Sequence, residues 1–386
     1  MRLRYLLLLA AAGCYVPPAV PEAKPPPKPR MPCDWVPADA GAPVDFQLET
    51  GTHSEPTDVL EDGEGGFAVE VWNYSGNWRD EFTTYAPDGS EVVTTMSDRR
   101  ATFAQPHGFS GVSAFGSNIE LFSSLGGEAS WRWAGGSANC ARLSAAWDPN
   151  GGTALAWVAQ WSLSNRAELE FASFDQAGGQ RAAELIIAEG AGEGLDPVLL
   201  GTTIAGNSLA LYGKPFAADM IKGRWITRTG APGEPFALDI SARLPEDYDA
   251  TAGNKNVLAP LLDGSLALRI GGTWVGTIES GRAELEPAPD WLANASNEEL
   301  AIVAGGRGYA IFSPDIGAGV CRQPIKLVDK SGIACRTLEV ATSTSACGPG
   351  TLSVGKAGTV FALLPPEGRS SGYIQTTVRR WPGLLH

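Results

Sequence analysis

Three turn-like stretches of the chain are rich in carboxylates: residues 61–66, 148–152 and 247–249. Carboxylate and main-chain oxygens are the ligands that Ca²⁺ prefers, so each stretch is a candidate calcium loop. None of them has the full pattern of alternating acidic residues closed by a later glutamate. Asp and Asn before Gly are also what tight turns require for conformational reasons. We therefore expect no cofactor, with Ca²⁺ as the alternative.

The chain also has 12 tryptophans, a high number for a protein of 386 residues. Exposed tryptophans stack on sugar rings, whereas buried ones fill cores. Trp157 and Trp161 lie on the same side of an expected strand as Leu155, which favours core packing. A carboxylate pair for glycoside hydrolysis would meet only in three dimensions, and no pair is singled out by its position in the sequence. Glycan binding or cleavage by Trp platforms and a carboxylate pair is therefore the alternative function.

Nucleophilic catalysis has little support in the sequence. The three histidines are His53, His107 and His386, and none has an obvious catalytic partner nearby. Nucleophile motifs such as G-x-S-x-G in a strand–turn–helix context are absent. We name no catalytic residue and expect a protein without enzymatic activity.

The first residues have the composition of an export signal. A basic start at residues 1–4 precedes an apolar stretch at 5–12, which is too short to span a bilayer as a helix. Small residues follow, ending in Gly13-Cys14. This segment resembles a bacterial lipoprotein signal, although Ala11 stands where the motif prefers Leu. The resemblance implies cleavage before Cys14 and lipid attachment to its sulfur. The alternative is an ordinary cleaved signal peptide with a coincidental cysteine.

We therefore divide the chain into a lipoprotein signal peptide at 1–13, a tether at 14–32 and a folded domain at 33–386. The tether is rich in proline and favours extended polyproline II. This division predicts an exported protein, anchored to the bacterial cell envelope by lipid, at the outer membrane or the cell surface.

A short pattern recurs along the domain: a large apolar residue, an alanine and another large apolar residue. Its alanines are spaced by 88, 54, 57, 43 and 52 residues, and a degenerate copy around residues 112–114 falls within the first gap. The six clear copies are centred on Ala68, Ala156, Ala210, Ala267, Ala310 and Ala362. The pattern predicts about seven units of roughly 50 residues.

Glycine-containing turns follow the alanine in most units, at residues 87–90, 176–179, 230–233, 279–282 and 329–332. Glycine supplies the positive φ that tight hairpins need. Each unit is therefore expected to have an inner strand that carries the alanine, followed by an outer hairpin. An alternating stretch at 44–48 predicts a further strand, which we expect to complete the last unit.

Residues 52–386 thus resemble a β-propeller of the repeat type seen in bacterial secreted and surface lipoproteins. We expect an all-β fold, with seven blades of four-stranded antiparallel sheets. Trp147-Asp148 is the only Trp-Asp dipeptide, so a WD40 repeat is not supported, and sialidase-type Asp boxes are absent. The resemblance specifies an architecture and no activity.

Five cysteines remain after Cys14, an odd number, and export permits disulfides. Three of them, Cys321, Cys335 and Cys347, lie close together in the sequence and could supply one bridge. A bridge between Cys33 and Cys347 would staple a ring closed, and we state it as a hypothesis, because connectivity does not follow from sequence. The cysteine spacings do not match zinc sites, so we expect no structural metal.

The chain carries 29 Lys and Arg against 43 Asp and Glu, a net charge of −14. Such a charge repels nucleic acid and anionic membrane surfaces. We expect a monomer that contacts the membrane only through its lipid, and whose protein or glycan partner is not specified. The resulting hypothesis is a surface-tethered propeller that acts in binding or scaffolding.

Overall fold

A computed structural model describes one compact unit of the chain, within residues 32–386. The residues described are 33–37 and 41–386, apart from connections at 52–53, 62–64, 74–78, 98–100, 106–107, 116–117, 126–127, 135–142, 161–166, 176–177, 191–194, 214–220, 239–256, 271–273, 280–281, 288–300, 313–314, 318–319, 344–349, 356–357, 365–367 and 371–372. The expected signal peptide and tether, with Cys14, lie outside these residues and remain predictions.

The described elements are all strands, which confirms the all-β prediction. They are β1 (Val44–Gly51), β2 (Ser54–Glu61), β3 (Phe67–Asn73), β4 (Arg79–Tyr85), β5 (Glu91–Ser97), β6 (Ala101–Gln105), β7 (Gly108–Phe115), β8 (Asn118–Leu125), β9 (Glu128–Ala134), β10 (Leu143–Trp147), β11 (Gly152–Gln160), β12 (Ala167–Asp175), β13 (Gln180–Gly190), β14 (Asp196–Thr202), β15 (Ser208–Gly213), β16 (Lys222–Ile226), β17 (Phe236–Ala237), β18 (Val257–Pro260), β19 (Leu266–Ile270), β20 (Trp274–Glu279), β21 (Arg282–Pro287), β22 (Ala301–Gly305), β23 (Gly308–Phe312), β24 (Asp315–Gly317), β25 (Val320–Asp329), β26 (Ala334–Ser343), β27 (Thr351–Val354), β28 (Val360–Leu363), β29 (Gly368–Ser370) and β30 (Tyr373–Trp381). No helix in this part of the chain is long and apolar enough to cross a membrane.

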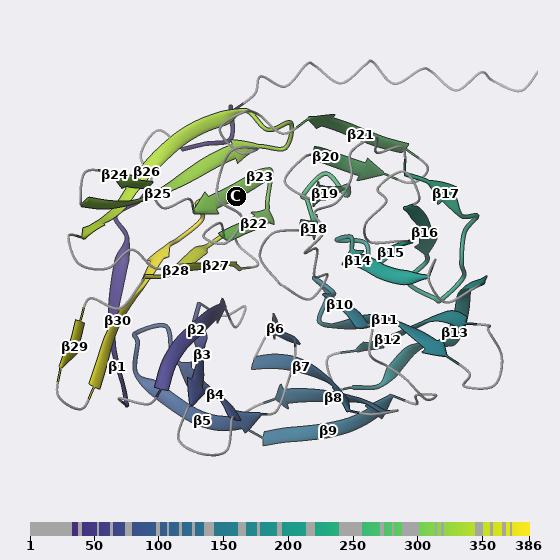
Figure 1. The fold of residues 1–386 in the computed structure, drawn as a ribbon, viewed down its shortest axis with the longest axis horizontal. Helices are drawn as coiled ribbons and strands as arrows, with labels where there is room; N and C mark the ends of the chain where they lie inside the picture. The colour runs from purple at the N-terminus through teal and green to yellow at the C-terminus, as the bar shows by residue number, and fades with distance from the viewer. Residues whose placement is uncertain are drawn as a thin grey trace, which may run out of the picture. The chain divides into compact units, whose positions relative to one another are not determined.

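Within the described residues the strands pair into seven antiparallel sheets, five of four strands and two that carry one short extra strand. The first strand of each sheet contacts the first strands of its neighbours, and the series closes because β27 of the seventh sheet contacts β2 of the first. Figure 1 shows the sheets following one another around a ring, with these first strands innermost. The protein therefore has the architecture of a β-propeller. The degenerate second unit is a complete four-stranded sheet, β6 to β9.

The N-terminal strand completes the last sheet, as the sequence predicted. β1 pairs with β30 over its whole length, with Val44 opposite Arg380 and Gly51 opposite Tyr373. Two bonds of 2.6 Å join the guanidinium of Arg379 to the carboxylate of Asp45 across this pair. The last sheet therefore contains both ends of the domain, so the ring is held closed by main-chain pairing.

The alanine pattern lies on a different strand from the one expected. It occupies the second strand of every sheet, from β3 to β28, and not the innermost strand. The expectation failed because each motif strand is preceded in its sheet by an innermost strand, such as β10 or β18, that carries no comparable pattern and so was not recognised in the sequence. The side chains of the six motif alanines are all buried, at 2% exposure or less.

These alanines do not share one structural position. Ala267 lies six residues after the first residue of the preceding turn, Leu261, whereas Ala210 lies seven residues after Thr203. Since side chains alternate between the two faces of a strand, this difference reverses the face on which the alanine lies. Ala156 and Ala210 belong to one core cluster between the third and fourth sheets. At some interfaces, both of the sheets that meet contribute a motif alanine. At other interfaces the contacts are made by large residues.

Other interfaces between sheets are filled by large residues. Leu209 and Leu211 of the fourth sheet share a cluster with Leu266 and Leu268 of the fifth. Small residues return between the sixth and seventh sheets, where Ala310 and Ala362 share another cluster. The packing between sheets is thus adjusted interface by interface.

Candidate functional site

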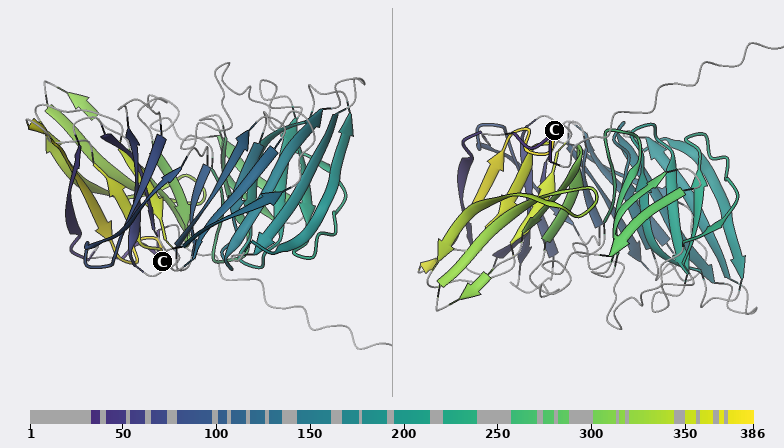
Figure 2. Two further views of the ribbon diagram at one scale, coloured as in Figure 1. Left: turned by 90° about the horizontal axis from the view of Figure 1, so that it is seen from below. Right: turned by 90° about the horizontal axis from the view of Figure 1, so that it is seen from above.

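The two ends of the ring differ in how the strands are connected. Because neighbouring strands are antiparallel, the connections from first to second and from third to fourth strands all lie at one end, which we call the turn end. The connections from second to third strands, and from each sheet to the next, lie at the other end, which we call the loop end. Figure 2 shows the strands running between these two ends. The loop end receives the longest connections, at 238–256 and 288–300.

Eight connections at the turn end share one construction. In each, the first residue's N–H donates to the fifth residue's carbonyl, and a glycine N–H at the fourth place donates back to the first residue's carbonyl. The glycine has φ between 69° and 88° in every case. These turns are 86–90, 148–152, 175–179, 203–207, 227–231, 261–265, 329–333 and 355–359. All five predicted hairpin turns fall between third and fourth strands.

This construction explains one candidate calcium loop, residues 148–152. Oδ1 of Asp148 accepts a hydrogen bond of 2.8 Å from the main-chain N–H of Asn150, and its other oxygen pairs with Arg181 of β13. Its carboxylate is therefore engaged in holding the turn and the neighbouring strand. Of the other two candidates, residues 62–64 and 247–249 lie outside the described part. Among the described residues, no group of three or more His, Cys, Asp or Glu is arranged to hold a metal ion.

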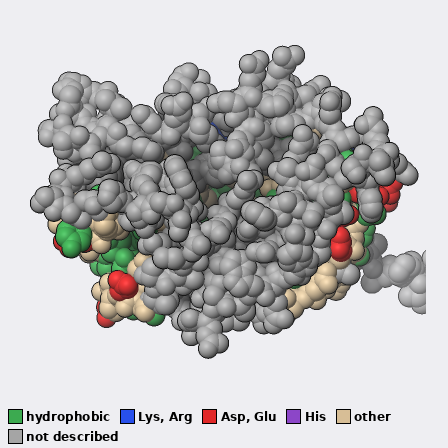
Figure 3. All heavy atoms as spheres, turned by 60° about the horizontal axis from the view of Figure 1, so that its bottom comes forward, with side chains coloured by type: hydrophobic (Ala, Val, Ile, Leu, Met, Phe, Trp, Pro, Cys, Tyr) green, Lys and Arg blue, Asp and Glu red, His purple; other side chains and the backbone are tan. Residues whose placement is uncertain are grey.

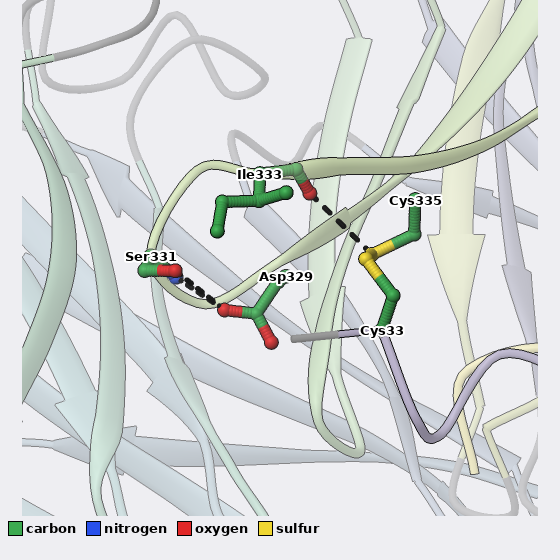
Figure 4. The surroundings of a disulfide bond; sticks show 5 residues. All are labelled: Cys33, Asp329, Ser331, Ile333 and Cys335. Atoms are coloured by element: carbon green, nitrogen blue, oxygen red, sulfur yellow. Dashed lines mark hydrogen bonds between the residues drawn. A yellow bond between two sulfur atoms is a disulfide. The ribbon is translucent and has the colours of Figure 1, made fainter. Parts of the chain in front are cut away.

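The structure corrects the proposed disulfide. Cys33 is bonded to Cys335, near the start of β26, with the two Cα atoms 5.3 Å apart, and not to Cys347, which lies outside the described residues. Figure 4 shows Cys335 shortly after the turn 329–333, where its disulfide sulfur lies 3.4 Å from the carbonyl oxygen of Ile333. The bridge ties the start of the domain to the outer hairpin of the sixth sheet. Sequence distance alone could not distinguish among the three clustered cysteines.

The residues after Cys33 pack against the same sheet. Trp35 is 7% exposed and belongs to the core cluster of the sixth and seventh sheets. Arg336 donates a hydrogen bond of 2.8 Å to the carbonyl of Pro37. A disulfide, a core tryptophan and a polar contact thus fix residues 33–37 to the domain before β1 begins.

The tryptophans with described side chains do not form a binding platform. Trp35, Trp157 and Trp381 are buried, and Trp147 and Trp225 are half-buried. Trp157 is 1% exposed on β11, a strand whose described side chains are buried on both faces. Trp157 is thus a core residue, as the alternation in the sequence predicted, whereas the same prediction for Trp161 remains untested. Trp72, Trp78, Trp131, Trp133 and Trp161 have no described side chains.

One carboxylate pair stands out among the described residues. Glu170 of β12 is 6% exposed and Glu184 of β13 is exposed. Burial, together with the hydrogen-bonding and like-charged carboxyl of Glu184, raises the pKa of Glu170 to about 7. The indole N–H of Trp157 is buried beside this carboxyl and favours its ionised form, which offsets part of the rise. Such a carboxyl can hold a proton at neutral pH and is chemically suited to act as a general acid.

The position of this pair does not match a catalytic cleft on the ring axis. Glu170 and Glu184 lie on the third and fourth strands of their sheet, the two furthest from the innermost strand β10. Sequence reasoning missed the pair because Glu168 and Glu170 alternate with apolar residues. That alternation normally indicates a solvent-exposed face. Only the neighbouring sheet makes that face an interior one.

A second perturbed carboxyl lies on an innermost strand. Asp58 is half-buried on β2, next to a bulge between Pro56 and Asp58. Burial raises its pKa to about 6, while the N–H of Val59, 2.8 Å from Oδ1, favours the ionised form. Nothing in the local sequence indicated this residue. Of the histidines, His53 and His107 lie outside the described residues, and His386 is exposed.

No protein-family model matches the chain, and no curated protein matches it. Solved structures with some similarity include polysaccharide lyase Uly1, at 10% identity and a TM-score of 0.45, covering 85% of this chain and 90% of that one. Puromycin hydrolase matches at 13% identity and a TM-score of 0.40 over 81% of this chain, which spans only 58% of that one.

The β-propeller domain of the trilobed protease from Pyrococcus furiosus matches at 10% identity and a TM-score of 0.39, covering 81% of this chain and 91% of that domain. Similarities this low transfer neither activity nor substrate. The class of the protein follows from its own strand pairing. The chain is a β-propeller protein whose sheets are closed by its N-terminal strand.

Proposed function

We propose that the protein is a surface-tethered lipoprotein whose propeller acts as a non-catalytic binding or scaffolding module. The observation that carries this proposal is the asymmetry between the two ends of the ring. Eight connections at the turn end are main-chain-bonded turns of one construction, whereas the long connections 238–256 and 288–300 begin and end at strand termini of the loop end. Binding residues concentrate on loops that a rigid scaffold positions, so the loop end is the proposed binding face.

The scaffold has the rigidity that this role requires. The ring is closed by β1 in the last sheet and by the Cys33–Cys335 bridge to the sixth. The C-terminal segment packs at the turn end, where the N–H of Leu385 donates to the carbonyl of Gly358 at 2.9 Å. Both ends of the domain are therefore used to lock the ring.

The use of tryptophan supports binding over glycan cleavage. All five tryptophans with described side chains are buried or half-buried, so in this part of the chain they offer no stacking surface. The described carboxylate pair lies toward the outer strands of its sheet, away from the ring axis. These two observations favour a binding module over a catalytic cleft lined by tryptophans.

The anchor and the surroundings of the protein follow from the signal-like start of the chain. Lipid on Cys14 would hold the domain at the outer membrane or cell surface through the proline-rich tether. Acidic side chains are visible at both sides of the face drawn in Figure 3, in keeping with the net charge of −14. We infer a monomer with a protein or glycan partner and without affinity for nucleic acid.

The first test is a glycan-array screen of the chain from Cys33 onward, followed by intrinsic Trp fluorescence. Saturable binding that changes Trp emission would move the function to the carbohydrate alternative. An absence of glycan binding leaves a protein partner, to be captured from envelope extracts and mapped with two variants. Replacing residues 241–254 by Gly and Ser is expected to abolish capture, and Leu262→Ser at the turn end is expected to retain it. Loss only in Leu262→Ser would place binding at the turn end.

A separate test addresses the anchor. Cells that express the full chain are labelled with an alkyne fatty acid, and the protein is isolated from membrane and soluble fractions. We expect label and membrane association in the parent chain and in Cys347→Ala, and neither in Cys14→Ala. Unlabelled, soluble parent protein would show that the signal is an ordinary one.

A further inference from the structure

Within the described part of the chain, one buried arginine has no hydrogen-bond partner. Arg269 of β19 is 1% exposed and is among the largest fully buried side chains. Its Nε, Nη1 and Nη2 atoms are all buried, and none has a hydrogen-bond partner among the described contacts. The other described arginines with printed contacts show the usual pattern: Arg224, for example, donates to the carbonyls of Gly233 and Ile187.

The surroundings of Arg269 are apolar. It lies opposite Val257 on β18 and Val275 on β20. Two residues earlier, on the same face of β19, Ala267 packs in the cluster between the fifth and sixth sheets, with Ile302 and Ile311. Arg269 therefore projects toward the sixth sheet. Since Val257 is the first residue of β18, the arginine lies near the loop end.

A polar group of the sixth sheet that interacts electrostatically with Arg269, the hydroxyl of Tyr309, is already engaged. The hydroxyl of Tyr309 lies 3.0 Å from the carbonyl oxygen of Leu268 and 3.1 Å from that of Gly276. Burial raises the pKa of this hydroxyl, so the tyrosine stays neutral and cannot act as a counter-ion. It holds β19 and β20 in place beside the guanidinium and supplies no charge.

Arg269 does not become neutral by losing its proton. Burial lowers its pKa only to about 10, so the guanidinium remains charged at neutral pH. A buried charge without a partner is among the most costly features that a fold can contain. Buried polar atoms without a protein partner usually indicate a bound ion or water. A single water cannot neutralise the charge, and the planar guanidinium fork matches two oxygens of one oxyanion.

We propose that Arg269 holds a small oxyanion, a carboxylate or a phosphate, between the fifth and sixth sheets near the loop end. The anion accepts hydrogen bonds from two guanidinium nitrogens and neutralises the charge in place. Apolar residues on both sheets exclude water from the pair, which favours a small ligand over a bulky one. This site is independent of the proposed binding role of the loop end, since it needs neither a macromolecular partner nor the lipid anchor.

The test is thermal unfolding of the protein in acetate, phosphate or chloride at constant ionic strength and pH. A ligand that binds only the folded state raises Tm in a saturable way. We expect a rise on the order of 3 °C at saturation with one of the two oxyanions over chloride. The anion that gives the larger rise at the lower concentration identifies whether the site takes carboxylate or phosphate.

Two variants separate the site from general salt effects. Arg269→Met removes the charge and is expected to abolish the anion-dependent rise. Arg224→Met removes a paired arginine of the fourth sheet and is expected to keep it. If Arg269→Met does not fold, Arg269→Lys keeps the charge but loses the fork, and the concentration needed for half the rise should increase at least tenfold.

Two results would overturn the proposal. One is a parent protein whose Tm is the same in acetate, phosphate and chloride. The other is an oxyanion-dependent rise that persists unchanged in Arg269→Met, which would place the bound ion elsewhere. The Tm measurements on the parent and on Arg269→Met do not depend on a glycan or protein partner at the loop end. The anion site and the binding role of the loop end can therefore be disproved separately.

Discussion

Phe67 of the first sheet and Phe361 of the seventh lie with their ring centroids 5.6 Å apart, across the interface at which the ring closes. Phe67 also packs against Phe46 of β1, at 5.0 Å. Both Phe67 and Phe361 are fully buried. The closure of the ring thus has an aromatic core in addition to its strand pairing.

This contact predicts that Phe361→Ala destabilises the protein by about 3–5 kcal/mol, through lost burial and the cavity left behind. Urea unfolding measures the change in free energy. Val92→Ala, at a side chain that is 64% exposed, is the control and should stay within about 0.5 kcal/mol. Equal effects of the two substitutions would show that the closing interface contributes little.

The Cys33–Cys335 bridge closes a loop of 302 residues in sequence separation. Its removal by Cys335→Ser is expected to lower stability by about 2–5 kcal/mol. Peptide mapping without reduction should recover a fragment that links the two cysteines, in the parent chain and in Cys347→Ser alike. A linked Cys33–Cys347 fragment would instead restore the pairing first suggested by the sequence.

Two glycines of neighbouring turns provide a matched pair for the C-terminal segment. Gly306 and Gly264 both have positive φ, of 56° and 88°. A Cβ at Gly306 would lie 1.3 Å from the carbonyl oxygen of Leu385, whereas a Cβ at Gly264 would meet nothing within 4 Å. We expect Gly264→Ala to cost about 1–2 kcal/mol from backbone strain alone.

Gly306→Ala should cost at least about 1–3 kcal/mol more, because the C-terminal segment must also move. Deletion of residues 384–386 should then remove most of this difference, since the obstructing carbonyl is gone. The measurement is the unfolding free energy of Gly264→Ala and Gly306→Ala, each with and without the deletion. A difference between the two alanine variants that survives the deletion would contradict this explanation.

The pKa of Glu170 predicts a pH dependence of stability. It is raised to about 7 in the folded protein, above the value near 4.5 of an unperturbed glutamate. The folded state therefore holds the proton more tightly, and this contribution to stability is present below about pH 4.5 and lost as pH rises through 7. Asp58, with a pKa of about 6, contributes in the same direction over an overlapping range.

Glu170→Gln should make the stability curve flatter between pH 5 and pH 8, and should stabilise the protein relative to the parent at pH 8. Chemical unfolding at several pH values measures this. Glu184→Gln, which removes the like charge, should shift the midpoint to lower pH. A curve for Glu170→Gln that parallels that of the parent would show that Glu170 does not titrate in this range.

The small interface between the third and fourth sheets predicts an asymmetric response to added volume. Ala210→Leu adds three carbons to the buried cluster that also contains Ala156, and should destabilise by about 1–3 kcal/mol. Ala205→Leu adds the same volume at an exposed place in the turn 203–207 and should be nearly neutral. Thermal unfolding distinguishes the two, and a tolerant Ala210 would mean that the interface can expand.

The sequence by itself determined the class of the fold. Regular recurrence of the alanine pattern, glycine turns after it and an alternating stretch at 44–48 together predicted repeated antiparallel sheets and the closing role of β1. These features are local: strand alternation and turn chemistry depend on residues close together in the chain. Local rules are therefore enough to identify the unit and its repetition.

Other features depended on which residues meet in space. The disulfide partner of Cys33 was decided by where the outer hairpin of the sixth sheet lies. The face of each motif alanine was decided by a shift of one residue relative to its turn, which local composition does not reveal. Glu170 and Arg269 appear as ordinary strand residues in the sequence. They become unusual only because a neighbouring sheet covers them, and burial between sheets is a property of the tertiary structure alone.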